Sequence, residues 1–307
     1  MRSLNRRAVA LAVLAATAFG TGAAFAQAYP NKPIKAIVPF AAGSATDQVA
    51  RSFTAKMTET LGQPFVIENK PGVNGMLGAD ATAKSAPDGY TVMVGTNSTN
   101  AALKSLMKKL PYDQDTAFAP VAYLGSVPLI VGINNDVPAK TLKELIDLAR
   151  AKPGTINYGS VGNGTSHHLG TEELKKLSGT NMVHVPYKGM GQVLTDVISG
   201  NIQMAFGNTP NAAPLIQEGK MRALAVAHPT RVPQLPDVPT AGEQGYPGFE
   251  SNSGYMYFAP GGTPPEVLDR LNAVFVEVLN LPAVKDALTK QGVEVKATTR
   301  AQTAEFI

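Results

Sequence analysis

Ile34-Lys-Ala-Ile-Val-Pro39, followed directly by Phe40-Ala-Ala-Gly-Ser-Ala-Thr-Asp47, is the segment that indicates the fold class. The first segment is short and apolar, which predicts a buried strand. The second is a loop of small residues, after which apolar side chains recur at every fourth position from Val49 to Leu61 and predict one face of a helix. Strand, loop and helix in this order are the repeating unit of an α/β fold.

The same unit recurs farther along the chain. Ile156–Tyr158 predicts a strand, Gly159-Ser-Val-Gly-Asn-Gly-Thr-Ser166 a Gly-rich loop, and residues 167–177 a helix. Two long β-type runs, Val121–Ile133 and Phe249–Ala259, join the two rounds. A pair of extended crossovers between rigid α/β units is what a hinge requires.

We therefore predict two α/β lobes. One is discontinuous and consists of residues 29–125 and 249–307, and the other consists of residues 126–248. At the C-terminus, Thr299-x-x-Gln302 predicts a capping box. Because only a few residues follow it, either the chain is truncated or its last helix is very short.

The N-terminus predicts export. Three arginines surround the start of the chain, an apolar run follows from Ala8 to Phe19, and Ala24-Phe-Ala26 places small residues where a signal peptidase reads. We expect residues 1–26 to be a signal peptide, with cleavage after Ala28 as the alternative. Two adjacent arginines leave both the Sec and the twin-arginine route open. The expected location is the periplasm.

Net charge and cysteine content exclude several classes of function. Removing residues 1–26 takes away three of the 27 basic residues and none of the 23 acids, so the net charge falls from +4 to about +1. This balance gives no support to nucleic-acid binding. The absence of cysteine excludes disulfides, thiolate catalysis and cysteine zinc sites.

No pattern in the sequence predicts catalysis or a metal site. The chain has four histidines but no His-Glu-x-x-His and no Gly-x-Ser-x-Gly. His167 and His168 are adjacent, so on a helix they point about 100° apart and cannot share a metal. We expect no catalytic residue, no metal and no cofactor, although a triad assembled in space would escape sequence patterns.

The two Gly-rich loops are the candidate binding site. Each lies at the carboxyl end of a strand and the start of a helix, where backbone N–H groups and the helix dipole favour an anion. Small side chains let a ligand approach the backbone. Neither loop continues as Gly-Lys-Ser/Thr or fits a dinucleotide fingerprint, so phosphate cofactors are disfavoured.

Other polar groups follow predicted strands and are candidates to line the same cleft. Asn97 and Ser98 belong to the polar stretch after the third strand, and Asn208 follows a strand of the second lobe. Lys188 is either a cation for the ligand or a solvated side chain. Asp47 would repel a carboxylate, so we predict that it orients its loop from the first helical turn.

These residues, read together, match a known family. The motifs that carry the resemblance are Tyr-Pro-x-Lys-Pro-Ile (29–34), Val-Pro-Phe-Ala-Ala-Gly (38–43), Glu-Asn-Lys-Pro-Gly (68–72), Pro-Asp-Gly-Tyr-Thr (87–91), Gly-Ser-x-Gly-x-Gly-Thr (159–165), Val-Pro-Tyr-Lys-Gly (185–189), Pro-Asp-Val-Pro-Thr (236–240) and Ala-Pro-x-Gly-Thr-Pro (259–264). Together they resemble the Bug family of periplasmic receptors. These receptors are the solute-binding components of tripartite tricarboxylate transporters.

The resemblance implies a type II periplasmic-binding-protein fold and a small carboxylate ligand held by backbone N–H groups, hydroxyls and bridging waters. It also implies integral-membrane transporter subunits as partners, and we expect the receptor to be a monomer. The ligand contacts that it implies are Phe40, Gly43, Ser44, Thr46, Gly162, Gly164, Thr165, Tyr187 and Asn208. His168 matches a family position as well, with either a ligand-binding or a structural role.

The chain departs from the family pattern in ways that leave its ligand open. Ser44 replaces the second of two adjacent glycines, Met190-Gly-Gln192 replaces a Gly/Pro/Ala stretch, and a tryptophan often found near Tyr255 is absent. Two other functions stay open. A ligand sensor for a membrane signalling protein would use the same closure, and an enzyme on this scaffold would need a nucleophile–base pair in the cleft.

Overall fold

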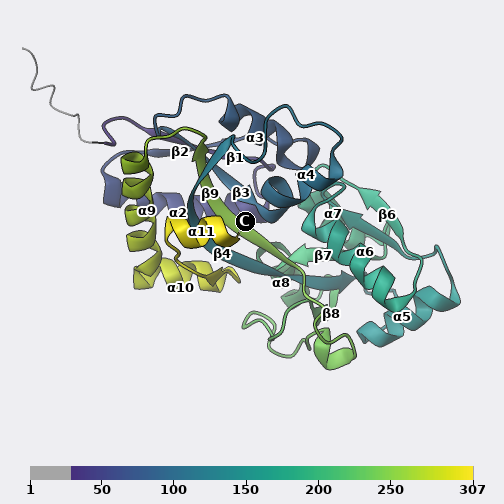
Figure 1. Ribbon diagram of the computed structural model, residues 1–307. Coiled ribbons are helices and arrows are strands. Elements are labelled where there is room, and N and C mark those ends of the chain that lie inside the picture. Colours follow the sequence, from purple (N-terminus) through teal and green to yellow (C-terminus); the bar gives the residue numbers. More distant parts are fainter. Residues whose placement is uncertain (1–28, 307) are drawn as a thin grey trace, which may run out of the picture. The chain divides into compact units, whose positions relative to one another are not determined.

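The computed structural model describes residues 29–306. The predicted signal peptide lies outside these residues, as does Ile307. The strands are β1 (Ile34–Val38), β2 (Phe65–Asn69), β3 (Thr91–Thr96), β4 (Phe118–Ile133), β5 (Asn157–Ser160), β6 (Val183–Pro186), β7 (Met204–Asn208), β8 (Arg222–Val226), β9 (Asn252–Pro260) and β10 (Glu294–Val295). All ten belong to one sheet, in which eight follow the order β2-β1-β3-β9-β4-β7-β5-β6, while β8 and β10 pair with β4 (Figure 1).

Helices connect these strands. They are α2 (Ala45–Leu61), α3 (Met76–Ala83), α4 (Leu103–Leu106), α5 (Leu142–Ala151), α6 (Ser166–Ser178), α7 (Met190–Ile198), α8 (Thr209–Gln217), α9 (Pro265–Asn280), α10 (Pro282–Lys290) and α11 (Arg300–Phe306), with short helical turns η1 (Val73–Gly75), η2 (Ser98–Ala102) and η3 (Gly242–Gln244). Within each half of the sheet, the strand–loop–helix units β1-α2 and β5-α6 have parallel neighbours: β2 and β3 for β1, and β6 and β7 for β5.

The long strand β4 joins the two halves of the sheet. Its first part, from Phe118 to Pro128, pairs antiparallel with β9. From Leu129 onward its neighbours are β7 and β8 instead. Figure 1 shows β4 and β9 running side by side. The predicted pair of β-type crossovers is thus a paired ribbon, and the fold is the two-lobed α/β fold expected from the sequence.

Each half of the sheet has its own apolar packing. In the half that contains β1, Phe53 of α2 packs with Tyr257 of β9 and Phe275 of α9, with ring centroids 4.5–5.6 Å apart. In the other half, Tyr158 and Phe206 are fully buried in a core between the sheet and the helices α5 and α6. Rigid packing on both sides holds the two strand–helix loops at fixed ends of their strands.

Sequence reasoning missed three helices, α4, α8 and α10, of which α8 lies beside the loops. Residues 209–217 form α8, with Asn208 as N-cap and Pro210 in its first turn, although Pro214 lies inside it. The prolines argue against a helix on propensity. The apolar side chains of Ala212 and Ala213 are buried against Ile130 and Val226, so tertiary packing outweighs the local preference.

Candidate functional site

The first Gly-rich loop ends in a capped helix. Ser44 is the N-cap of α2, and its Oγ accepts the Asp47 N–H at 3.3 Å. Gly43 has a φ of 77°, in the left-handed region that favours glycine. Its N–H is already donated to Asp47 Oδ2 at 2.9 Å, so this group is not the free donor that the sequence suggested. A side chain of the helix itself therefore holds the loop.

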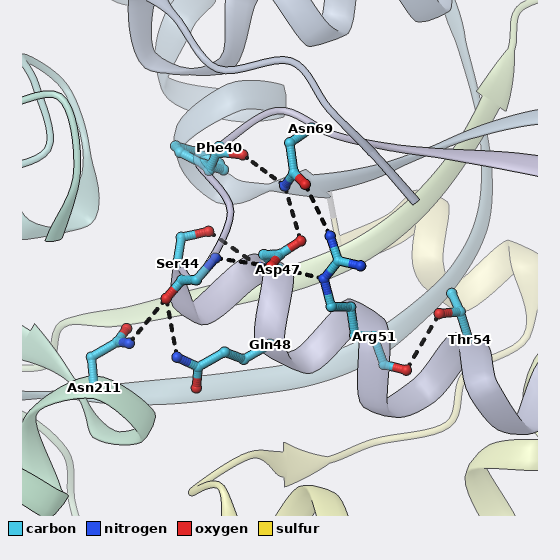
Figure 2. Close-up of polar contacts among 9 residues, drawn as sticks. Phe40, Ser44, Asp47, Gln48, Arg51, Thr54, Asn69 and Asn211 are labelled. Carbon is cyan, nitrogen blue, oxygen red and sulfur yellow. Dashed lines mark hydrogen bonds and ion pairs between the residues drawn. The ribbon is translucent and has the colours of Figure 1, made fainter. Parts of the chain in front are cut away.

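Asp47 is a buried carboxylate at the centre of a polar cluster, which Figure 2 shows. Besides Gly43, its carboxylate accepts from Asn69 Nδ2 at 2.9 Å and from Arg51 Nε at 3.0 Å. Asn69 Nδ2 also donates to the Phe40 carbonyl at 3.1 Å. Burial by itself raises the pKa of Asp47, but the bonds from Arg51, Gly43 and Asn69 outweigh it and hold the pKa below its ordinary value. The carboxylate is ionised, and its charge is already neutralised by Arg51.

The second loop repeats this geometry with a different side chain. Thr165 is the N-cap of α6, and its Oγ1 accepts the His168 N–H at 3.4 Å. The Gly164 N–H is donated to His168 Nδ1 at 3.2 Å, four residues ahead, as Gly43 donates to Asp47. An acceptor Nδ1 carries no proton, so this imidazole is neutral with its proton on Nε2.

A histidine from a neighbouring strand supports the same loop. His184 Nε2 lies 2.6 Å from Ser160 Oγ, which accepts the Gly162 N–H at 3.1 Å. The rings of His168 and His184 are 4.3 Å apart, and Tyr158 stacks on His184 at 4.9 Å. Burial lowers the pKa of His168, and burial together with the nearby His168 lowers that of His184 to about 4. Both rings are therefore neutral near pH 7.

Ser160 and His184 form a pair that resembles a nucleophile and its base. Ser160 is fully buried, however, and neither residue lines the cavities described below. Its hydroxyl is engaged with the Gly162 N–H and with the Gly162 carbonyl at 3.2 Å. A catalytic pair has to reach a substrate. This pair instead fixes the conformation of the second loop.

Both loops contribute to one small cavity of about 40 Å³, which we call the inner cavity. Its wall is made of hydroxyl, amide and small apolar groups: Phe40, Ala41, Ser44, Ala45, Thr46, Thr96, Ser98, Val161, Thr165, His167, Lys188, Gly189, Met190, Asn208 and Ser253. The lining holds no carboxylate, and Lys188 is its one cation, because burial lowers the pKa of His167 to about 4. The inner cavity therefore suits an anion.

A larger open groove of about 990 Å³ adjoins the inner cavity, and we call it the outer groove. The two share Phe40, Ala41, Val161 and Lys188. The remaining wall of the outer groove is formed by Pro71, Gly72, Val73, Asn74, Gly75, Leu103, Leu106, Met107, Gly162, Asn163, His168 and Tyr187.

The predicted site residues divide into three groups. Six of them line the inner cavity: Phe40, Ser44, Thr46, Ser98, Thr165 and Asn208. Three line the outer groove instead: Gly162, His168 and Tyr187. The remaining three, Gly43, Asn97 and Gly164, line neither of these two cavities. Lys188, for which the sequence left two interpretations open, lines both.

Several of these side chains bind each other. Asn208 Nδ2 donates to Ser253 Oγ at 2.9 Å, so its Oδ1 accepts from His167 Nε2 at 2.7 Å. The Tyr187 hydroxyl donates to Asp196 at 2.7 Å, which leaves only its ring for the outer groove. Sequence reasoning missed His167, Met190 and Ser253 as lining residues. No local pattern distinguishes them, because strand–helix packing from distant segments brings them to the cavity.

Asn97 and Ser98 connect the two halves of the sheet. Ser98 Oγ accepts the Ser166 N–H at 3.1 Å, and Asn97 Oδ1 accepts from Ser166 Oγ at 3.3 Å. On the other side, Asn211 Nδ2 of α8 donates to the Gly43 carbonyl at 3.4 Å. Each Gly-rich loop is thus contacted by a side chain from the opposite half. Ser98 satisfies one of the N–H groups at the start of α6 that a ligand would otherwise meet.

Residues 29–306 contain no group of His, Asp and Glu arranged to hold a metal ion. Within the same part of the chain, no helix has both the length and the apolar character of a membrane span.

Comparison with known proteins identifies relatives of this chain. The family described as "Tripartite tricarboxylate transporter family receptor" matches residues 49–307. Protein BugT of Bordetella pertussis is 35% identical over 306 residues, which cover 99% of this chain and 94% of BugT. The BugT match spans both Gly-rich loops, whereas the family match begins just after the first loop and includes the second. Both matches include the ribbon of β4 and β9.

Two solved structures with bound carboxylates are similar to this chain. A protein of R. palustris with adipate is 33% identical, has a TM-score of 0.87, and is matched over 91% of this chain and 93% of its own. MatC from Rhodopseudomonas palustris with bound malate is 37% identical with a TM-score of 0.80, over 86% of this chain and 90% of its own. In both comparisons, the likeness covers nearly the whole of the described chain.

Proposed function

Because this chain belongs to the tripartite tricarboxylate transporter receptor family, we propose that it is a periplasmic solute-binding protein that captures a small organic carboxylate in the inner cavity. The observation that carries this proposal is the convergence of two capped helix starts on one cavity without an acidic wall residue. Hydroxyls of Ser44 and Thr46 supply neutral donors, and the helix dipoles favour the negative charge. The Thr165 hydroxyl is donated to the Gly162 carbonyl at 2.8 Å and so holds the second loop in shape. Adipate and malate in the two related structures support a carboxylate as the ligand.

Ligand binding is coupled to the arrangement of the two loops. A ligand that contacts both loops at once favours the arrangement in which they face each other, by its differential affinity for that state. The partner switch of β4 at Pro128 and Leu129 supports lobe boundaries near residues 125 and 249. Residues 29–125 with 249–307 then form one lobe, and residues 126–248 the other.

We further propose delivery of the ligand to integral-membrane transporter subunits by a monomeric receptor, after export with cleavage near Ala26. Membership of a transporter receptor family supports this partner over a membrane signalling protein. Co-purification of the receptor with the membrane subunits, in the presence and absence of ligand, separates the two. Capture by a membrane kinase alone would favour the sensor.

A thermal-shift screen tests the ligand class, because a ligand that binds only the folded state raises the melting temperature. We expect stabilisation by one or more carboxylates among dicarboxylates, tricarboxylates, amino acids and aromatic acids. The matched variant is Ser44→Ala with Thr165→Val, which removes one hydroxyl from each loop. We expect it to reduce the shift while the protein without ligand still unfolds cooperatively. Stabilisation by sugars or cations alone would refute the proposal.

A further inference from the structure

The walls of the two cavities differ in a way that bears on which carboxylate binds. The inner cavity, at about 40 Å³, has room for roughly three water-sized groups. That is enough for a carboxylate head with its contacts, and too little for a ligand body. The body of any bound acid therefore has to extend through the shared residues Phe40, Ala41 and Val161 into the outer groove.

The outer groove has an apolar wall with very little charge. Val73 and Leu106 are 51% and 48% exposed there, although large apolar side chains are costly to leave in water. Leu103, Met107 and Tyr187 extend the same surface. Leu106 also reaches the second loop, because a Cβ added at Gly164 would lie 2.1 Å from its Cδ1. The groove thus offers an apolar surface built from both halves of the sheet.

Lys188 is the single charged group of the outer groove, and it lies where the groove meets the inner cavity. Its side chain makes no ion pair with any residue in the described part of the chain. A carboxylate head in the inner cavity would lie against the wall to which Lys188 belongs. Among residues 29–306, the wall offers a second carboxylate farther out no other cation, so the water that this carboxylate loses against the apolar wall is not replaced by an ion pair. Beyond Lys188 the polar wall is neutral, and both amide atoms of Asn74 are buried without a partner.

Resting on the proposed function, we infer that the preferred ligand is a monocarboxylate with an aliphatic or aromatic body, whose far end carries no charge. The carboxylate binds between the two loops with Lys188 beside it, and the apolar body covers Leu106 and Val73. This preference differs from the dicarboxylates in the two related structures, malate and adipate.

Calorimetric titration of the full mature chain with acetate, hexanoate, 3-phenylpropanoate and adipate tests the inference. Hexanoate and adipate have the same carbon chain and differ only in the second carboxylate. We expect hexanoate and 3-phenylpropanoate to bind at least about ten-fold more tightly than acetate, because each CH₂ group that the ligand buries adds to the affinity. We expect adipate to bind at least about ten-fold more weakly than hexanoate.

Two variants locate the ligand. Leu106→Asn should lower the affinity for hexanoate toward that of acetate, whereas Leu177→Asn, at a 55% exposed leucine outside both cavities, should change neither. Lys188→Gln should weaken every acid by a similar factor, because the lysine lies beside the common head. Loss of adipate binding alone in Lys188→Gln, or adipate equal to or tighter than hexanoate in the wild type, would overturn the inference and leave carboxylate capture intact. Failure of every acid to bind would instead overturn the proposed function.

Discussion

The loop of residues 40–47 and the loop of residues 159–166 share a backbone plan but differ in the group that holds their glycine. In each, an N-cap hydroxyl accepts the N–H of the third helical residue, and that residue accepts the N–H of the glycine before the cap. Asp47 does this as an anion bonded to Arg51 and Asn69. His168 does it as a neutral ring stacked near His184. We therefore expect the two loops to differ in how strongly their glycine is held and in the pH range over which that hydrogen bond is lost.

The largest difference is expected when the two glycines are enlarged. Gly43 and Gly164 have nearly the same φ, 77° and 81°, so valine strains both backbones alike. A Cβ at Gly43 meets nothing within 4 Å, whereas one at Gly164 collides with Leu106. We expect Gly164→Val to weaken carboxylate binding about 100-fold, since overpacking of this kind costs about 1–3 kcal/mol. Gly43→Val should weaken it by less than about ten-fold, measured by calorimetry.

A second substitution tests whether the collision with Leu106 causes the loss of affinity in Gly164→Val. If the collision with Leu106 is responsible, Leu106→Ala in the Gly164→Val background should recover part of the affinity. Equal losses in the two glycine variants, without such recovery, would show that backbone strain alone governs both loops.

The next effect concerns the stability that each acceptor provides. Asp47→Ala leaves the Arg51 guanidinium, the Asn69 amide and the Gly43 N–H without their buried acceptor. We expect it to lower the free energy of unfolding by about 2 kcal/mol, because two neutral donors lose a charged acceptor, whereas the 52% exposed Arg51 side chain is rehydrated. His168→Ala removes one neutral bond and should lower it by about 1 kcal/mol. Urea unfolding at pH 7 measures both, and a larger loss in His168→Ala would reverse the comparison.

The two loops should respond to different ranges of pH. His168 and His184 have folded-state pKa values below the ordinary 6.5, so the unfolded chain binds protons first as the pH falls. The contribution of these two histidines to the free energy of unfolding is therefore fully present above about pH 6.5, and it is lost as the pH falls toward about 4. Asp47 has a lowered pKa, so its contribution is present above its ordinary value of 3.8 and is lost only in stronger acid.

Unfolding measured at pH 7, 5.5 and 4.5 tests this assignment. His184→Gln should reduce the fall in the free energy of unfolding between pH 6.5 and 4.5. The fall that remains comes from His168 and from His167, because burial also lowers the pKa of His167 to about 4. Asp47→Asn should keep the slope of the wild type in this range. An unchanged slope in His184→Gln would show that the histidine pair does not titrate on unfolding.

The smallest effect is expected at the contacts that reach each loop from the opposite half. Ser98→Ala removes the acceptor of the Ser166 N–H and should cost about 1 kcal/mol of stability or two- to five-fold in affinity. Asn211→Ala removes a long, exposed bond to the Gly43 carbonyl and should cost about 0.5 kcal/mol at most. Calorimetry and urea unfolding of both variants give the comparison. A larger loss in Asn211→Ala would show that the first loop depends more on the opposite half.

Much of the fold was predictable because its signals are local. The strand from Ile34 and the helix that ends at Leu61 were predicted at almost the observed bounds, since apolar periodicity and the Gly-rich loop mark them. α8 was not, because Pro210 and Pro214 oppose a helix and only burial of Ala212 and Ala213 stabilises it. For the same reason, Asn208 was expected after its strand and is instead the last residue of β7 and the cap of α8.

Local sequence was enough to specify two strand–loop–helix units with hydroxyl caps, a chain without cysteine, and the motifs of a carboxylate receptor. These features depend on residues within a few positions of each other, where backbone geometry and capping act directly. Only the tertiary structure decided that Gly43 and Gly164 donate to their own helices, that His184 reaches Ser160, and that Leu106 covers the second loop. The contacts of His184 and Leu106 join segments far apart in the chain, and the donor of each glycine depends on which side chain the packing leaves within reach.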